Sequence, residues 1–186
     1  MGVRLLILGA SGLVGRHVLQ LALDHSGIDR VIAPTRKALP AQAKLSNPHA
    51  DRIDTLVNDV PAIDAVVCAL GTTMVKAGSR EAFLAVDYAL PLAFAKAAHQ
   101  KGAEAFALVS AIGASLRPMF IEGERGEFRL GEAAVLQFCK LFSRLLPRGF
   151  RVNPASVIAE AALKAVMPPT EGVHFIYSQD LTSNPT

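Results

Sequence analysis

Three glycines in a short run, Gly9, Gly12 and Gly15, are the residues whose spacing points most directly to chemistry. They separate an apolar strand-like stretch from a helix-like one. Glycine permits a tight turn with positive φ, the close approach of a phosphate, and close packing of a helix on a strand. The helix that follows would direct its free N–H groups and the positive end of its dipole towards an anion. The loop therefore predicts a site for a dinucleotide pyrophosphate, with an ordinary strand-to-helix turn as the alternative.

The spacing is G-x-x-G-x-x-G and not G-x-G-x-x-G, so the surrounding elements must support this interpretation. Continuous apolar runs at 3–8, 31–35, 64–70 and 105–110 predict parallel strands covered on both faces, with helical spacing between them. This alternation predicts an α/β fold, a doubly wound parallel sheet of the Rossmann type. The cofactor-binding residues expected in the first loop are Gly9, Ser11, Gly12, Leu13, Val14 and Gly15.

The remaining elements complete a single expected domain over residues 1–186, in which 115–186 form the substrate side. Residues 56–57 are a candidate short strand, and 115–131 are a charged, glycine-rich loop without a period. Amphipathic patterns predict helices over 131–146 and 154–166. A short strand is expected at 173–177.

Composition narrows the function classes. The chain has 186 residues, a formal charge of +3 and no Lys/Arg-rich run, which argues against nucleic-acid binding. No apolar run is long enough to span a membrane, and the five histidines show no metal-ligand spacing. Two cysteines in apolar surroundings suit a reducing compartment, so a cytoplasmic protein is expected. A homodimer is left open.

The residues after the second strand indicate which dinucleotide binds. An NAD site usually places an acid there, to accept a hydrogen bond from the ribose 2′-OH, but residues 33–37 read Ala-Pro-Thr-Arg-Lys. Asp29 precedes the strand and would lie at its other end. Arg36 could bind a 2′-phosphate through its planar guanidinium, with Lys37 adding charge. NADP is therefore predicted over NAD, which stays the alternative; Arg36 and Lys37 could equally be solvated loop cations.

Three further runs carry a family resemblance: Cys-Ala-Leu-Gly-Thr-Thr at 68–73, Ala-Val-Asp-Tyr at 85–88, and Leu-Val-Ser-Ala-Ile-Gly-Ala at 108–114. With the glycine loop, they make the chain resemble the atypical short-chain dehydrogenase/reductase superfamily. More narrowly, it looks like bacterial relatives of the Tat-interacting short-chain dehydrogenase-like protein. The resemblance implies that Leu70, Gly71 and Thr72 line the cofactor. It also implies that Ser110 is catalytic and polarises a substrate carbonyl, although a serine there could simply cap the strand.

The chain departs from that superfamily at the proton donor. The superfamily's chemistry requires a tyrosine with a lysine four residues later, which lowers the pKa of the phenol. The tyrosines here are Tyr88 and Tyr177, followed at that distance by Leu92 and Leu181. About one βα unit, on the order of 30 residues, is missing between Phe120 and Ile121. Either the protein has lost this unit, or the printed sequence omits it.

Two functions follow from these observations. The first is an NADP-dependent oxidoreductase of the short-chain dehydrogenase type, acting on an unidentified small carbonyl or hydroxyl compound. The second is a non-catalytic protein that senses the dinucleotide and presents a surface to a partner. The charged loop at 115–131 shows no pocket signature that would name a substrate.

Overall fold

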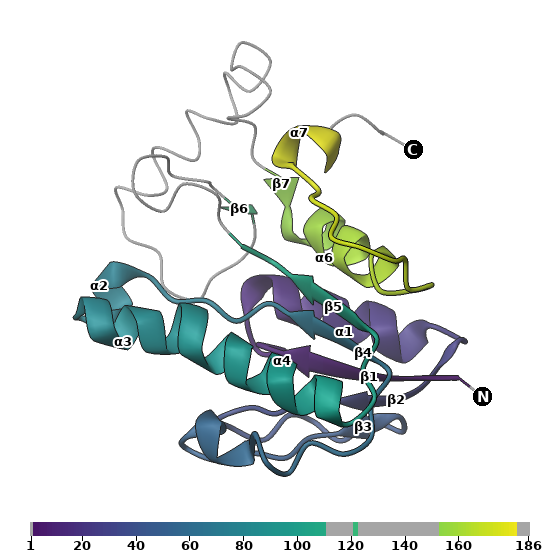
Figure 1. The fold of residues 1–186 in the computed structure, drawn as a ribbon, viewed down its shortest axis with the longest axis horizontal. Helices are drawn as coiled ribbons and strands as arrows, with labels where there is room; N and C mark the ends of the chain where they lie inside the picture. Colours follow the sequence, from purple (N-terminus) through teal and green to yellow (C-terminus); the bar gives the residue numbers. More distant parts are fainter. Residues whose placement is uncertain (1, 111–120, 123–152, 182–186) are drawn as a thin grey trace.

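A five-stranded parallel sheet forms the centre of the molecule in a computed structural model that describes residues 2–110, 121–122 and 153–181 (Figure 1). The strand order β3-β2-β1-β4-β5 confirms the doubly wound α/β fold. The strands are Val3–Leu8 (β1), Ile28–Ile32 (β2), Leu45–Ser46 (β3), Ala65–Cys68 (β4) and Ala105–Leu108 (β5). All four neighbouring pairs run parallel, with Leu5 opposite both Val31 and Ala65.

Helices cover both faces of this sheet, which explains why its strands are continuously apolar. Leu13–Asp24 (α1) and Ala155–Lys164 (α6) pack together on one face. The other face carries Leu90–Gln100 (α4), which continues Arg80–Leu84 (α3) through a π-helical turn at Ala85–Ala89. A short helix, Met74–Ala77 (α2), precedes α3.

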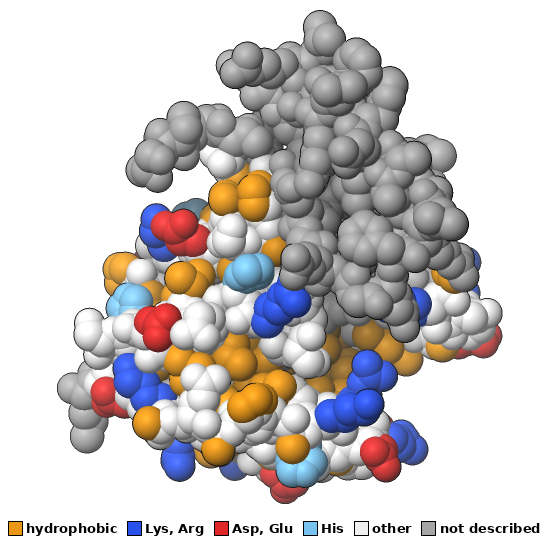
Figure 2. All heavy atoms as spheres, turned by 180° about the vertical axis from the view of Figure 1, so that it is seen from behind, with side chains coloured by type: hydrophobic (Ala, Val, Ile, Leu, Met, Phe, Trp, Pro, Cys, Tyr) orange, Lys and Arg blue, Asp and Glu red, His pale blue; other side chains and the backbone are white. Residues whose placement is uncertain are grey.

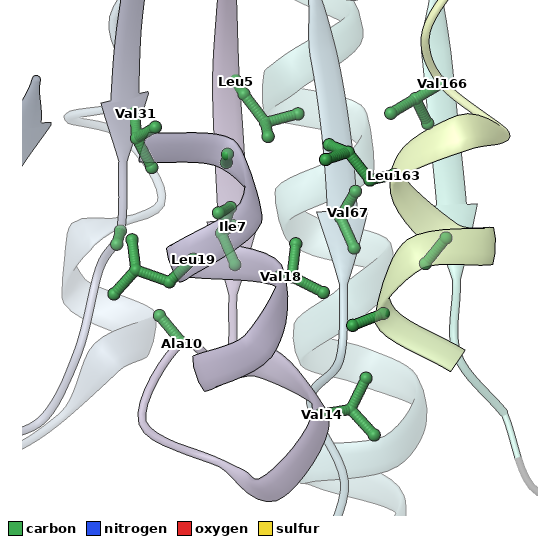
Figure 3. Packing of buried hydrophobic residues seen from close by; sticks show 14 of the residues in the cluster. Leu5, Ile7, Ala10, Val14, Val18, Leu19, Val31, Val67, Leu163 and Val166 are labelled. Carbon is green, nitrogen blue, oxygen red and sulfur yellow. The ribbon is translucent and has the colours of Figure 1, made fainter. Parts of the chain in front are cut away.

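Side chains of β1 alternate between two hydrophobic clusters because successive residues of a strand point to opposite faces. Leu5 and Ile7 pack with α1 and α6, as Figure 3 shows, whereas Leu6 and Leu8 lie in the cluster that contains Phe94 of α4. All four of these β1 side chains are fully buried. The strand is thus fixed from both sides, and its carboxyl end, where the glycine loop begins, is held rigidly.

Two of the strands predicted from the sequence differ in the structure. The second strand covers Ile28–Ile32 and not 31–35, because pairing with Val3 starts it earlier and Pro34 has no N–H to continue it. The expected strand at 56–57 is wrong: Ile53–Leu56 form a 3-10 helix, and β3 supplies the third strand. Local bonding explains this turn, since the Thr55 hydroxyl donates to the Arg52 carbonyl oxygen at 2.7 Å.

The carboxyl-terminal part also differs in places. The helix expected at 154–166 is present as Ala155–Lys164, with Pro154 at its N-cap. The strand expected at 173–177 is wrong, because this segment pairs with no strand in the described part of the chain and its side chains are exposed. Within the loop expected at 115–131, Ile121–Glu122 (β6) pairs in parallel with Asn153–Pro154 (β7). The rest of that loop and the helix expected at 131–146 lie outside the described residues, and Ser178–Leu181 (α7) ends the described chain.

Candidate dinucleotide-binding site

The carboxyl ends of β1, β2, β4 and β5 meet at one edge of the sheet because all four strands run in the same direction. The connection from β3 to β4 crosses over β2 and β1, so the strand order reverses between β1 and β4. Ligands of open α/β sheets bind at such a point, outside the carboxyl ends of the strands. The loops after β1, β2 and β4 therefore define the candidate site.

Gly9 and Gly15 are required by the backbone of the first loop. Gly9 has a φ of +81°, and a Cβ there would lie 2.5 Å from the carbonyl oxygen of Ala69. A Cβ on Gly15 would fall on the carbonyl oxygen of Gly9 itself. These two glycines bring α1 close to the strand and bend the chain sharply between them.

Gly12 has no such requirement. It is the N-cap of α1, with φ −80° and ψ 175°, a conformation open to any residue. A Cβ there would lie 3.1 Å from the carbonyl oxygen of Gly9, which is tight but within reach of a small adjustment. The backbone angles at this position therefore do not require glycine.

Among the residues that the structure describes, no side chain caps the N-terminus of α1. The first turn of this helix carries no acidic residue. The Gly12 N–H is used inside the loop, donating to the Gly9 carbonyl oxygen at 2.8 Å. Ser11 is exposed, whereas the Val14 side chain is buried in the core, so Val14 can offer a ligand only its backbone. These features fit a pyrophosphate at the helix N-terminus.

The loop after β4 is anchored by Asp87 from the π-helical turn. The Thr72 N–H donates to Asp87 Oδ2 at 3.0 Å, and a Cβ on Gly71 would lie 3.7 Å from Asp87 Oδ1. Leu70 and Thr72 are half-buried and Gly71 is exposed. Asp87 therefore holds in place the loop that the resemblance assigns to the cofactor.

Cys68, at the end of β4, is not a nucleophile in this environment. The pKa of its thiol is raised to about 11, chiefly by burial; a backbone hydrogen bond from Leu70 opposes the shift, and the nearby Asp87 carboxylate adds to it. The thiol is therefore protonated at neutral pH.

The loop after β2 carries Arg36 and Lys37, both exposed, and no acidic residue occurs between 33 and 39. Asp29 lies near the amino end of β2, where its Oδ2 accepts from the Gly2 N–H at 2.6 Å. It is thus at the opposite edge from the glycine loop.

The sequence analysis missed Asn47, whose side chain forms hydrogen bonds with the loop after β2. The signal in the sequence was a lone asparagine between a short strand and Pro48.

Ser110 lies two residues beyond β5, exposed, at the same edge as the glycine loop. The Val109 N–H donates to the Cys68 carbonyl oxygen at 2.9 Å, which keeps this end of the chain beside β4. Tyr88 lies on the π-helical turn with 64% of its surface exposed. Within the described ranges no group of three or more potential metal ligands occurs, and no helix has the length and apolarity needed to cross a membrane.

Comparison with a family model decides what this site is for. The model described as NAD(P)H-binding matches residues 9–132, a stretch that starts at the first glycine of the loop. The chain belongs to the NAD(P)H-binding family. Residues 9–132 contain every loop of the candidate site, so the family match and the geometry concern the same edge of the sheet.

Fungal proteins are among the curated relatives. Protein fmp52, mitochondrial, from Aspergillus clavatus is 30% identical over 209 residues, covering 89% of this chain and 88% of that protein. Protein FMP52, mitochondrial, from Lodderomyces elongisporus is 36% identical over 129 residues, and this chain spans only 54% of its length. The 209 aligned positions take up 89% of a 186-residue chain, about 166 residues. About 40 positions of the Aspergillus protein therefore have no counterpart here.

Solved structures show the same fold at low sequence identity. A short chain dehydrogenase family protein from Francisella tularensis superposes with a TM-score of 0.60 at 14% identity, covering 88% of this chain and 90% of that one. A variant of uronate dehydrogenase from Agrobacterium tumefaciens, complexed with NAD, gives 0.61 at 16% identity, covering 92% and 75%. The chain is thus structurally similar to short-chain dehydrogenases.

The expected cytoplasmic location is contradicted, because these curated relatives are named as mitochondrial proteins. That expectation rested on two cysteines in apolar surroundings, which do not distinguish the cytoplasm from another reducing compartment.

Proposed function

We propose that this protein is an NADP(H)-dependent oxidoreductase of the atypical short-chain dehydrogenase type, acting on a small carbonyl or hydroxyl compound. The observation that carries the proposal is Gly12, a glycine with ordinary backbone angles at the uncapped start of α1. Its missing side chain leaves room for a phosphate at the switch point of the sheet. Residues 115–186 would belong to the same single domain, which is supported by the shared core of α6 and α1.

The preference for NADP over NAD rests on charge around the loop after β2. Arg36 and Lys37 bring two positive charges to the carboxyl edge, and Asp29 is engaged at the opposite edge. A guanidinium can bind a 2′-phosphate through two parallel hydrogen bonds, which NAD cannot use. Calorimetric titration with NADPH and with NADH tests the preference, and Arg36→Ala should reduce it by about tenfold.

The matched control is Arg30→Ala, which removes the same exposed charge from within β2, away from the proposed site. It should leave both affinities within about twofold. Equal binding of NADPH and NADH by the unaltered protein would refute the preference. Absence of binding to either would refute the proposed function altogether.

Substrate chemistry would take place beside Ser110. Its exposed hydroxyl group can donate a hydrogen bond to a carbonyl oxygen and so hold it at the carboxyl edge. The bound cofactor would supply or accept the hydride. Ser110→Ala should lower kcat by about 100-fold in an assay of NADPH oxidation over a panel of aldehydes and ketones. No turnover of any member of the panel by the unaltered protein would count against the enzyme.

A second function, a non-catalytic sensor of the dinucleotide, is favoured by one observation. Neither tyrosine of the sequence has a lysine four residues later, so the proton donor that the superfamily uses is not encoded. The intact mass of the protein isolated from its natural source separates the two functions. A mass near 19.7 kDa would support the sensor. A distinctly larger mass would show that the natural protein contains the missing βα unit and would support the enzyme.

A further inference from the structure

A single side chain, that of Asn47, is bonded to the loop after β2 on both sides of Arg36. Its Nδ2 donates to the Ala33 carbonyl oxygen at 2.6 Å and to Thr35 Oγ1 at 2.8 Å. Its Oδ1 accepts from the Leu39 N–H at 2.7 Å. Both N–H groups and the oxygen of the amide thus form hydrogen bonds with the same loop, on both sides of the arginine.

Thr35 extends this network to the next residue. Its hydroxyl accepts from Asn47 and donates to the Lys37 carbonyl oxygen at 2.6 Å. The Thr35 side chain is buried, with 3% of the residue exposed, and its N–H donates to the Pro48 carbonyl oxygen at 3.1 Å. The backbone at 35 and 37 is therefore fixed, while the side chains of Arg36 and Lys37 stay exposed.

The bonding pattern is specific to an amide. An aspartate at 47 could accept from Leu39 but could not donate to Ala33, and an aliphatic residue could do neither. Asn47 comes directly after β3, a strand of only two residues, so its side chain adds to the few backbone bonds that hold this edge of the sheet. A network in which each polar group is paired keeps one loop conformation.

We propose that Asn47 is a positioning residue for cofactor specificity: it holds the loop so that Arg36 meets the 2′-phosphate of an adenosine ribose. This inference rests on the proposed preference for NADP. Two fixed points on either side of Arg36 reduce the conformational entropy that the loop loses when a phosphate binds, and this pre-organisation raises affinity. This gain in affinity should therefore be measurable only with ligands that carry the 2′-phosphate.

The experiment compares ligands that differ only in that phosphate. Affinities of adenosine 2′,5′-bisphosphate and 5′-AMP, and of NADPH and NADH, are measured by calorimetry for the unaltered protein and for Asn47→Ala. We expect Asn47→Ala to weaken both 2′-phosphorylated ligands by about tenfold. The other two should change by less than about twofold. An equal loss for all four ligands would overturn the inference and leave dinucleotide binding intact.

A double-mutant cycle tests whether Asn47 acts through Arg36. If it does, adding Asn47→Ala to Arg36→Ala should weaken adenosine 2′,5′-bisphosphate by less than about twofold beyond the single Arg36→Ala change. Independent, additive losses would overturn the inference. Asn58→Ala is the matched control, because Asn58 is an exposed asparagine in the turn after the 3-10 helix, and it should change no affinity.

Thr35 keeps the inference testable if Asn47→Ala does not fold. Thr35→Ser retains the hydroxyl and should retain the preference for the 2′-phosphate, whereas Thr35→Val removes it and should weaken the 2′-phosphorylated ligands selectively. Equal behaviour of the two variants would contradict the positioning role. If the unaltered protein shows no preference, the NADP proposal and this inference both fall. If it binds no dinucleotide, the proposed function has failed.

Discussion

Gly12 and Gly15 are both glycine, but for different physical reasons. At Gly15 a side chain would collide with the backbone of Gly9, so the residue is dictated by the packing of α1 on β1. At Gly12 the backbone is unstrained and the nearest obstacle is 3.1 Å away. A motif that reads as one unit in the sequence thus divides into a glycine that the packing requires, Gly15, and one whose backbone angles do not require it, Gly12.

Two alanine substitutions separate these roles. Gly12→Ala should lower the free energy of unfolding by no more than about 1 kcal/mol but weaken NADPH binding by about tenfold or more. Gly15→Ala should lower the free energy of unfolding by about 3 kcal/mol, because a rigid backbone oxygen occupies the place of the new methyl group. Urea unfolding and calorimetry measure the two quantities. A Gly12→Ala variant that binds NADPH normally would remove the main support for the site.

At the scale of elements, the π-helical turn between α3 and α4 positions the loop after β4. This turn presents Asp87 to the Thr72 N–H. π-Helical turns are rare and occur often at functional sites. The bond from Thr72 to Asp87, fifteen residues away, depends on how this helix packs across β4.

Asp87→Ala should therefore loosen this loop without unfolding the sheet. We expect hydrogen exchange at the Thr72 amide to become about tenfold faster, since its acceptor is lost. Asp87→Asn keeps an acceptor oxygen in the same place and should restore most of the protection. Unchanged exchange in Asp87→Ala would show that the loop is held by other contacts.

A second contact between elements joins β1 to the residue preceding β4. Arg4 donates to Asp64 from Nε at 3.0 Å, from Nη2 at 2.6 Å and from its backbone N–H at 2.8 Å. The side-chain bonds from Arg4 hold the pKa of Asp64 below its usual range, against the opposing effect of burial. Because the pKa is lowered in the folded state, the contact stabilises the protein above the ordinary aspartate pKa of about 3.9 and is lost as the pH falls through the folded value.

Asp64→Asn should accordingly lower Tm by about 1–3 °C at pH 7, a small effect because both side chains are more than a third exposed to solvent. The difference from the unaltered protein should shrink as the pH is lowered below about 4. Asp54→Asn is the control: its partner Arg52 is two residues away, so no distant elements are joined and Tm should hardly change. A constant difference between pH 7 and pH 2 would contradict this account.

At the scale of the whole molecule, the point to test is whether another segment covers the β5 edge of the sheet. Among the described strands β5 has a neighbour on one side only, and Phe106 and Leu108 are 40% and 53% exposed. About 40 positions of the Aspergillus relative have no counterpart in this chain. Elsewhere the surface is mixed: Figure 2 shows basic side chains spread among acidic and apolar ones on the face that it presents.

Leu108→Lys tests whether this edge is covered. In the chain as printed we expect the free energy of unfolding to change by less than about 1 kcal/mol, because half of the side chain already contacts water. Light scattering should show less self-association, since lysine on an edge strand opposes pairing. Leu8→Lys, at a fully buried position of β1, should unfold the protein and serves as the contrast. Similar loss of stability in both variants would mean that another segment covers β5.

Local patterns were sufficient to predict the parallel α/β sheet and an NAD(P)-binding domain of the Rossmann type. Strand and helix periodicity are encoded in neighbouring residues, and the loop after β1 follows one of those strands directly. The length of β2, the 3-10 helix at Ile53–Leu56 and the unpaired segment at 173–177 could not be predicted in this way. Each depends on which partner strand lies alongside, and pairing partners are distant in the chain.

The site shows the same division. Their position in the sequence was enough to propose Gly12 and Arg36 as ligand-binding residues. Each lies just beyond a predicted strand, and glycine and arginine are residue types that often contact phosphate groups. The bonds of Asn47 around Arg36, of Asp87 to Thr72, and the contact of Gly9 with Ala69 came only from the folded chain. These contacts join segments that meet only when parallel strands bring their carboxyl ends to a common edge, so no local pattern could reveal them.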